Sequence, residues 1–227
     1  MGRAADIRAS DGFKLSAWRS DPAGKPKAAV VVLQEFFGIT DYIREVCERF
    51  AGLGYVGIAP GLFDRVERWV ELEYNKEGME RGDALRAKLT VEKSLIDVQA
   101  AVDYAKQFGK VGVVGFCWGG SLAYLAASRL HDVAAAVGYY GGWIAKYAAE
   151  RPRAPTMLHF GETDFTIPME DVEKVKKLRP EIPLYVYPAG HAFDCTSRKH
   201  FDPPSFHKES SDLANARTAE FLAKYLA

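Results

Sequence analysis

Residues 110–130 read KVGVVGFCWGGSLAYLAASRL and combine an apolar run, a glycine-rich turn and a helical segment. The first run is typical of a buried strand, and the residues after the turn have the pattern of a helix. Between them, residues 115–119 have the form G-x-nucleophile-x-G, with Cys117 at the centre. Such a turn presents its central side chain at a sheet edge and at a helix N-terminus, where negative charge is favoured. We therefore predict that Cys117 is a nucleophile, although most free cysteines are simply buried as small apolar residues.

Short apolar runs alternate with longer amphipathic segments along the rest of the chain. Candidate strands lie at residues 28–35, 56–60, 133–140, 154–161 and 183–190, and candidate helical segments lie at residues 40–55, 81–109, 169–178 and 211–227. This order predicts one α/β domain over residues 1–227, with a mostly parallel sheet and helices on both of its faces. Residues 61–80 are the one long irregular segment, and we expect a loop there above the carboxyl edge of the sheet.

The composition indicates a small-molecule partner. Thirty basic and thirty acidic residues cancel and no basic cluster stands out, so we expect neither nucleic acid nor a membrane as a partner. The three cysteines have no metal-ligand or C-x-x-C spacing, which predicts no metal site and free thiols in a reducing compartment. Together with the polar N-terminus, they predict a cytoplasmic protein, and we expect a monomer or a small homo-oligomer.

Other reactive side chains follow predicted strands, at the edge where open α/β sheets bind ligands. The order Cys117, Asp164, His191 is that of nucleophile, acid and histidine in the α/β-hydrolase fold. Glu162 in the same loop is an alternative acid, and the loop residues can also be simple turn residues. Glu35 ends the first of these strands and is predicted to lie beside the same site, with a solvated loop carboxylate as the alternative.

Five motifs resemble those of dienelactone hydrolases, the carboxymethylenebutenolidase family of α/β-hydrolases. They are QEFFGI at residues 34–39, GFCWGG at 115–120, VGYYG at 137–141, GETD at 161–164 and AGHAF at 189–193, within a resemblance that covers residues 28–225. The resemblance implies a single α/β-hydrolase domain without a large lid and without a cofactor. It also implies a triad of Cys117, His191 and Asp164, with the backbone N–H groups of Phe36 and Trp118 as the oxyanion hole.

The same resemblance implies a reaction. The family hydrolyses a carboxylate-bearing lactone, 4-carboxymethylenebut-2-en-4-olide, to maleylacetate in the catabolism of aromatic compounds, which here implies a thioester on Cys117. Because a charged Glu35 opposes a nearby thiolate, the resemblance implies a neutral resting thiol whose proton passes to Glu35 when substrate binds. The alternatives are a general short-chain carboxylesterase or thioesterase, and a non-catalytic binding protein on the same fold.

The substrate contacts follow from the resemblance with two departures. The family binds the substrate carboxylate with one arginine within residues 61–86 and a second arginine four residues after the triad histidine. Arg81 is predicted to be the first, with Arg86 as an alternative, whereas Cys195 occupies the second position and Arg198 lies close to it. Tyr139 and Tyr140 end a predicted strand, where they either line the pocket or belong to the core.

Overall fold

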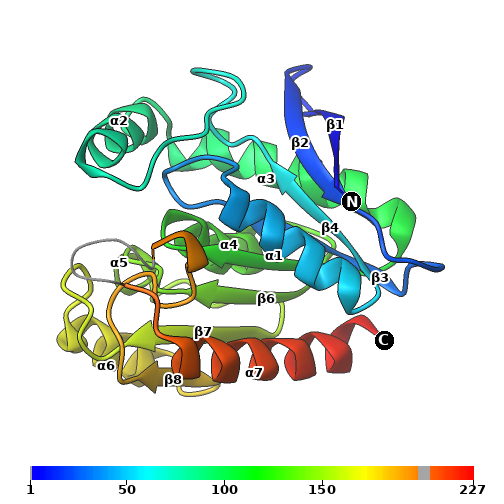
Figure 1. Cartoon of the computed structure of the whole chain (residues 1–227). Helices are drawn as coiled ribbons and strands as arrows, with labels where there is room; N and C mark the ends of the chain where they lie inside the picture. Colours follow the sequence, from blue (N-terminus) through cyan, green and yellow to red (C-terminus); the bar gives the residue numbers. More distant parts are fainter. Residues whose placement is uncertain (1, 199–204) are drawn as a thin grey trace.

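The computed structural model describes residues 2–198 and 205–227 and is built on one sheet of eight strands (Figure 1). The strands are β1 (Arg3–Arg8), β2 (Lys14–Ser20), β3 (Ala28–Leu33), β4 (Tyr55–Pro60), β5 (Val111–Phe116), β6 (Val133–Tyr139), β7 (Thr156–Gly161) and β8 (Leu184–Tyr187). Their order in the sheet is β1-β2-β4-β3-β5-β6-β7-β8, and all neighbours from β4 to β8 are parallel. The predicted α/β fold with a mostly parallel sheet is confirmed.

The N-terminal strands β1 and β2 form an antiparallel hairpin that extends the sheet beyond β4. No strand is predicted there, because polar residues dominate the segment. The pairing places Ile7 opposite Leu15, and both side chains are buried. Cross-strand apolar pairs of this kind stabilise a hairpin, and their contribution depends on a pairing that the linear pattern does not reveal.

Helices cover both faces of the sheet, as predicted. They are α1 (Asp41–Gly52), α2 (Lys76–Arg86), α3 (Val91–Ala105), α4 (Trp118–Arg129), α5 (Ile144–Tyr147), α6 (Met169–Leu178) and α7 (Lys208–Leu226), with 3-10 turns η1 (Lys106–Phe108) and η2 (Thr196–Arg198). Because side chains alternate along a strand, Val30 and Val32 of β3 share an apolar cluster with α1 and α7, whereas Val31 and Leu33 share one with α3 and α4. The two clusters pack the helices against both faces of the sheet and so hold the carboxyl ends of its strands in place.

The single helical segment predicted over residues 81–109 is wrong, because a turn at residues 87–90 separates α2 from α3. Thr90 and Asn75 begin α3 and α2, since each side chain accepts a hydrogen bond from the backbone amide three residues later. Residues 61–75 form most of the expected loop, and α2 follows them on the side of the sheet where the parallel strands end (Figure 1). A helix rather than an irregular loop therefore stands over this edge.

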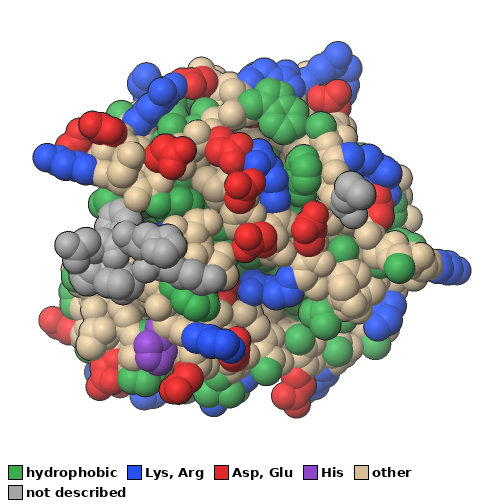
Figure 2. Space-filling view, in the orientation of Figure 1, with side chains coloured by type: hydrophobic (Ala, Val, Ile, Leu, Met, Phe, Trp, Pro, Cys, Tyr) green, Lys and Arg blue, Asp and Glu red, His purple; other side chains and the backbone are tan. Residues whose placement is uncertain are grey.

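Acidic and basic side chains are interspersed on the face drawn in Figure 2. This mixture agrees with the equal numbers of the two kinds in the sequence. Within residues 2–198 and 205–227, no helix is both long and apolar enough to cross a bilayer.

Candidate active site

Cys117 stands between β5 and α4 in a strained turn. Its backbone has φ 54° and ψ −116°, and a conformation of this kind costs about 1–3 kcal/mol in a residue that has a Cβ. The Cys117 N–H donates a 3.0 Å hydrogen bond to the Tyr139 carbonyl of β6, and the Ser121 N–H donates one of 3.2 Å to the Cys117 carbonyl. These bonds hold the turn, so the thiol is presented at the carboxyl edge of the sheet and at the N-terminus of α4.

The glycines of this turn are needed for close packing and not for a special backbone conformation. The positive φ belongs to Cys117 and to none of its neighbouring glycines. A Cβ on Gly119 would lie 2.2 Å from the Leu33 carbonyl oxygen and 2.6 Å from the Gln34 carbonyl oxygen. The Gly119 N–H instead donates a 3.1 Å hydrogen bond to Gln34. The start of α4, which carries Trp118, is thereby fixed against the segment after β3, which carries Phe36.

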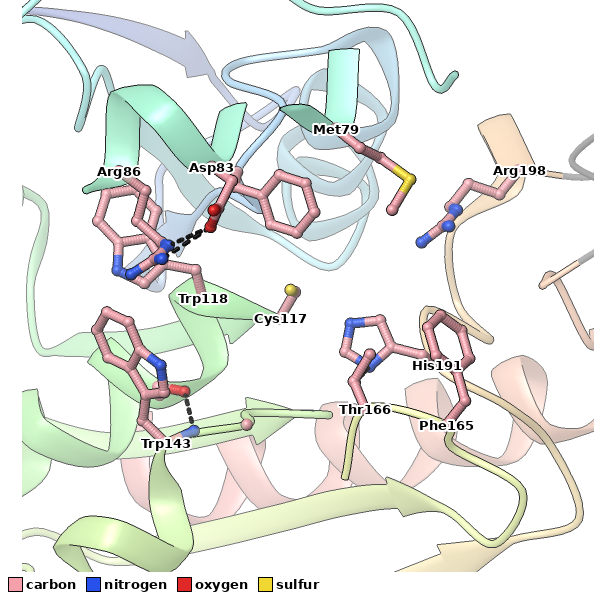
Figure 3. Close-up of a pocket in the computed structure, with 13 residues that line it drawn as sticks. Met79, Asp83, Arg86, Cys117, Trp118, Trp143, Phe165, Thr166, His191 and Arg198 are labelled. Atoms are coloured by element: carbon pink, nitrogen blue, oxygen red, sulfur yellow. Dashed lines mark hydrogen bonds and ion pairs between the residues drawn. The ribbon is translucent and has the colours of Figure 1, made fainter. Parts of the chain in front are cut away.

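His191 and Asp164 follow β8 and β7 and are hydrogen-bonded to each other. His191 Nδ1 lies 2.7 Å from Asp164 Oδ2 and 2.9 Å from the hydroxyl of Thr166. Asp164 Oδ1 accepts hydrogen bonds from the Thr166 hydroxyl at 2.7 Å and from the backbone N–H groups of Thr166 and Ile167 at 2.8 and 3.1 Å. This network orients the imidazole so that Nε2 is on the side of the Cys117 sulfur (Figure 3).

The charges around His191 favour its protonated form. Burial alone lowers the pKa of an imidazole, but the negative charge that Cys117 carries once its thiol is ionised and the hydrogen bonds with Asp164 and Cys117 outweigh burial and raise the pKa of His191 to about 10. Burial alone raises the pKa of the Asp164 carboxyl, but its hydrogen bonds with His191 and Thr166 outweigh burial and hold this pKa below its usual value. Asp164 therefore stays ionised and stabilises an imidazolium at His191.

Glu35 is a buried carboxyl group with only 1% of its surface exposed, so the alternative of a solvated loop carboxylate is wrong. Its Oε2 accepts a 3.1 Å hydrogen bond from the hydroxyl of Tyr74. Burial raises the pKa of Glu35, and this effect is opposed by the charges of Arg198 and His191 and by hydrogen bonds from Tyr74 and Cys195. Glu35 thus lies within the electrostatic field of His191, although it is not among the described residues that line the adjoining cavity.

A cavity of about 290 Å³ opens over Cys117 and His191 (Figure 3). Its wall is largely apolar and includes the side chains of Phe36, Met79, Trp118, Trp143 and Phe165. The helix α2 covers one side of the cavity. Its backbone lies very close to that of Phe36, since a Cβ added to Gly82 would be only 2.1 Å from the Phe36 carbonyl oxygen. The thiol, the imidazole and the two residues predicted to form the oxyanion hole therefore border one small, mostly apolar space.

Comparison with known proteins identifies the family of the chain. A model of the dienelactone hydrolase family matches residues 15–226. The chain belongs to this family. Carboxymethylenebutenolidase 1 of Cupriavidus pinatubonensis is 33% identical in an alignment of 229 positions that covers 96% of this chain and 95% of that enzyme. The carboxymethylenebutenolidase of Pseudomonas knackmussii is 31% identical over 96% of this chain and 94% of that enzyme. A putative dienelactone hydrolase from Klebsiella pneumoniae has a similar crystal structure, with a TM-score of 0.85 and 27% identity over 99% of this chain and 100% of that chain.

Membership in the dienelactone hydrolase family establishes the class of activity. The chain is an ester or lactone hydrolase, as predicted. Its substrate is accordingly a small ester or lactone.

The arginines of this dienelactone hydrolase family member differ from the expected arrangement. Arg81 is not brought to the cavity, because its side chain is 57% exposed and pairs with Glu67. Successive helical residues are rotated by 100°, so Arg86, five positions later, lies on another face of α2 and lines the cavity. Its guanidinium lies 5.2 Å from the centre of the Trp143 ring and 2.7 Å from Asp83. Arg198 also lines the cavity, from the turn η2.

Tyr139 and Tyr140 belong to the core and not to the wall of the cavity. They are 1% and 0% exposed, and neither is among the described lining residues. The Tyr139 hydroxyl is 2.6 Å from the hydroxyl of Thr218 on α7. The Tyr140 ring lies 5.1 Å from the ring of His191, so it packs against the imidazole and limits its movement.

Two cysteines and one cluster of acidic and histidine side chains lie outside the described wall of the cavity. Cys47 is buried in α1, where burial raises the pKa of its thiol, and Cys195 is buried beside Glu35 with its pKa raised in the same way. Among the described residues, the one cluster of possible metal ligands is Asp103, His131 and Asp132. All three are exposed and none lines the cavity.

Several residues around the site were not identified from the sequence, among them Thr166, Trp143 and Tyr74. Thr166 had a local signal, because a threonine two positions after Asp164 is typical of a turn in which the aspartate accepts backbone hydrogen bonds. Trp143 is held by a 3.0 Å hydrogen bond from its backbone N–H to the hydroxyl of Ser121, and Tyr74 reaches Glu35 across 39 positions of sequence. Contacts of such long range follow from the fold and have no local pattern.

Proposed function

We propose that this member of the dienelactone hydrolase family cleaves its ester or lactone with Cys117 as the nucleophile, through a thioester intermediate. The observation that carries the proposal is the strained turn, which presents the Cys117 thiol in the cavity beside His191. The turn also lies at the N-terminus of α4, where a developing negative charge is favoured. His191 acts as general acid and base, and Asp164 orients it.

The first half of the reaction forms the thioester. Rotation of the Glu35 side chain brings its carboxylate to the thiol. The carboxylate takes the thiol proton, and the resulting thiolate attacks the carbonyl carbon of the substrate. The negative charge that develops on the carbonyl oxygen is held by the backbone N–H groups of Phe36 and Trp118. The carbon–oxygen bond then breaks, and the leaving oxygen takes a proton from the imidazolium of His191.

The second half releases the acid. His191, now neutral, takes a proton from water, and the resulting hydroxide attacks the thioester carbon. The carbon–sulfur bond breaks, and the sulfur recovers a proton from the newly formed acid. The products are an alcohol or enol and a carboxylate, and Glu35 still holds the proton that it took from the thiol. One proton must therefore leave Glu35 before the next turnover.

A lactone that carries its own carboxylate, of the dienelactone type, is the substrate class that we propose. Arg86 supports this choice, because a guanidinium can bind a carboxylate at two points and it borders the cavity. A neutral short-chain ester is the second candidate. It is favoured by the aromatic wall and by Asp83, which already pairs with Arg86.

The nucleophile is tested by Cys117→Ala. We expect hydrolysis of lactones and esters to fall by about 10³-fold or more, because one member of a catalytic unit is removed, while the melting temperature changes little. Intact mass spectrometry of the wild-type protein during turnover of a slow ester should detect the acyl group on the peptide that contains Cys117. Substantial residual turnover in the variant, or an acyl group on another residue, contradicts the assignment, and no hydrolysis by the wild type would favour a binding protein.

The substrate class is tested by Arg86→Leu, with Arg81→Leu as a matched control on the outer face of the same helix. If Arg86 binds a carboxylate, kcat/KM for an anionic lactone should fall by about 10- to 100-fold, which corresponds to about 1.5–3 kcal/mol. The value for a neutral ester of similar size should change little, and Arg81→Leu should leave both values unchanged. An equal loss on both substrates indicates that Arg86 only supports Trp143, and no loss on either favours the neutral-ester candidate.

A further inference from the structure

Two hydroxyl groups connect Glu35 with the surface. Tyr74 donates its hydroxyl hydrogen to Glu35 Oε2 over 3.1 Å, and the Tyr74 oxygen lies 2.9 Å from Oγ1 of Thr40. Since the phenol has one hydrogen and gives it to Glu35, Thr40 is the donor in the second bond. The Tyr74 ring is held in place by Phe37, whose ring centre is 4.4 Å away. The hydrogens of this chain therefore point in one direction, from Thr40 through Tyr74 to the carboxylate.

Thr40 occupies a position where its hydroxyl normally has another use. It is the N-cap residue of α1, and threonine at an N-cap usually accepts a hydrogen bond from an amide of the first helical turn, which stabilises a helix by about 1 kcal/mol. In this protein the Thr40 side chain makes no such bond. Its hydroxyl bonds with Tyr74 instead, even though the residue has the backbone conformation of a cap. The Thr40 residue is only 3% exposed.

The Thr40 end of this series of hydrogen bonds reaches a groove in the surface that is separate from the main cavity. A groove of about 300 Å³ is lined by Thr40 and Tyr74 together with Asp41, Glu71, Leu72, Glu73 and Ser197. The carboxylates of Asp41 and Glu71 are exposed and pair with Arg44. Figure 2 shows several acidic side chains close together near the middle of the face that α1 covers in Figure 1. The groove is wide enough to hold water.

We propose that Tyr74 and Thr40 are a proton relay that carries the proton of Glu35 to water in this groove, separately from the cavity that holds the substrate. The proposal rests on the proposed function, in which Glu35 takes the thiol proton in each turnover. Glu35 is 1% exposed and is not among the described lining residues of the main cavity, so direct loss of its proton to bulk water is impeded. The relay gives the proton an exit while product still fills the cavity.

The transfer is balanced and leaves the contacts that the structure shows. Once protonated Glu35 has rotated back from the thiol, it donates to Tyr74, Tyr74 donates to Thr40, and Thr40 donates to a water in the groove. The Glu35 proton moves to the Tyr74 oxygen, the former Tyr74 hydrogen moves to Thr40, and the former Thr40 hydrogen moves to water. Afterwards Thr40 donates to Tyr74 and Tyr74 donates to an ionised Glu35, which is the arrangement of short contacts described above.

The test is Thr40→Val, because it removes the outer hydroxyl and leaves the bond between Tyr74 and Glu35 in place. We expect kcat at low buffer concentration to fall by about tenfold, equivalent to raising the limiting barrier by about 1.4 kcal/mol. A small, diffusible proton acceptor such as imidazole should restore kcat as its concentration rises, and Thr40→Ser should retain the wild-type rate. The matched control is Thr196→Val, which removes an exposed threonine hydroxyl that bonds with Glu45 and leaves the relay intact.

A structural role for Thr40 gives a different result. A loss of kcat that imidazole does not restore, or a wild-type rate in Thr40→Val at every buffer concentration, overturns the relay. Neither outcome affects the nucleophile, because Cys117→Ala tests it independently with the same substrate. Conversely, retention of activity in Cys117→Ala would refute the proposed function without involving Thr40.

Discussion

Asp164 and Glu35 are both buried carboxylic acids that follow strands of the sheet, yet their surroundings differ in kind. Asp164 accepts hydrogen bonds from two backbone amides, one hydroxyl and an imidazole, which lower its pKa in spite of burial. For Glu35, burial is the largest influence, and the nearby positive charges and the Tyr74 hydroxyl do not cancel it, so its pKa is raised.

This difference separates the roles that two similar side chains can take. A carboxylate with a lowered pKa keeps its charge throughout a reaction and suits the orientation of a histidine. A carboxyl group with a raised pKa is closer to the working pH and can gain and lose a proton in each turnover. The structure thus favours Asp164 as the fixed charge and Glu35 as the group that titrates.

Replacement of Asp164 should have the larger effect. In Asp164→Asn the amide can donate to Nδ1, which favours the wrong tautomer of His191, and we expect kcat to fall by about 10³- to 10⁴-fold. Steady-state kinetics on one ester measure the effect. Glu162→Gln is the matched control in the same loop, because Glu162 is exposed and the alternative acid that the sequence leaves open. If Glu162→Gln loses activity and Asp164→Asn retains it, the two acids exchange roles.

Replacement of Glu35 should have a smaller effect of a different form. Glu35→Gln keeps the shape and removes the group that we propose accepts the thiol proton, so we expect kcat to fall by about 100-fold. Because a negative charge near Cys117 is lost, the resting thiol should react with iodoacetamide no more slowly than in the wild type, or even faster. Unchanged turnover on all substrates, or a thiol that becomes much harder to alkylate, would contradict Glu35 as the activating group.

Much of the fold was predictable because the parallel strands are buried on both faces and form continuous apolar runs, as in residues 28–33 and 111–116. The turn at Cys117 and the order of the reactive residues also came from local patterns. The hairpin of β1 and β2 did not, since its apolar pairs become visible only when the strands are placed side by side. The break before α3 was missed because Thr90 acts through a cap and not through the apolar period.

The residues of the candidate site were predictable where a motif falls at the end of a strand. They were not predictable where the rotation of a helix or a contact distant in sequence determines which side chain reaches the site. Cys117, Asp164 and His191 follow strands, so their meeting at one edge follows from the topology. Arg81 was placed by its distance along the chain, whereas the rotation of α2 turns it outward and brings Arg86 to the cavity. No local signal connects Tyr74 with a carboxyl group that lies in another loop.

The smallest predicted effect is on stability, and its sign differs between the two carboxyl groups. The folded state lowers the pKa of Asp164, so this group stabilises the fold above its ordinary pKa, and the stabilisation is lost as the pH falls through the lowered value. The folded state raises the pKa of Glu35, so its favourable contribution is present at low pH and is lost as the pH rises through the raised value. Each unit of pKa difference is worth about 1.4 kcal/mol.

Melting temperatures of the two variants between about pH 3 and pH 8 should therefore diverge from the wild type in opposite directions. Asp164→Asn should be less stable than the wild type near neutral pH, and the deficit should shrink as the pH falls below about 4. Glu35→Gln should match the wild type at low pH and gain on it as the pH rises, by about 2–4 °C for each kcal/mol in a domain of this size. Parallel pH profiles for the two variants would mean that the hydrogen bonds to Asp164 and the burial of Glu35 have the same net effect on the proton, and the division of roles between the two carboxyl groups would then have no electrostatic basis.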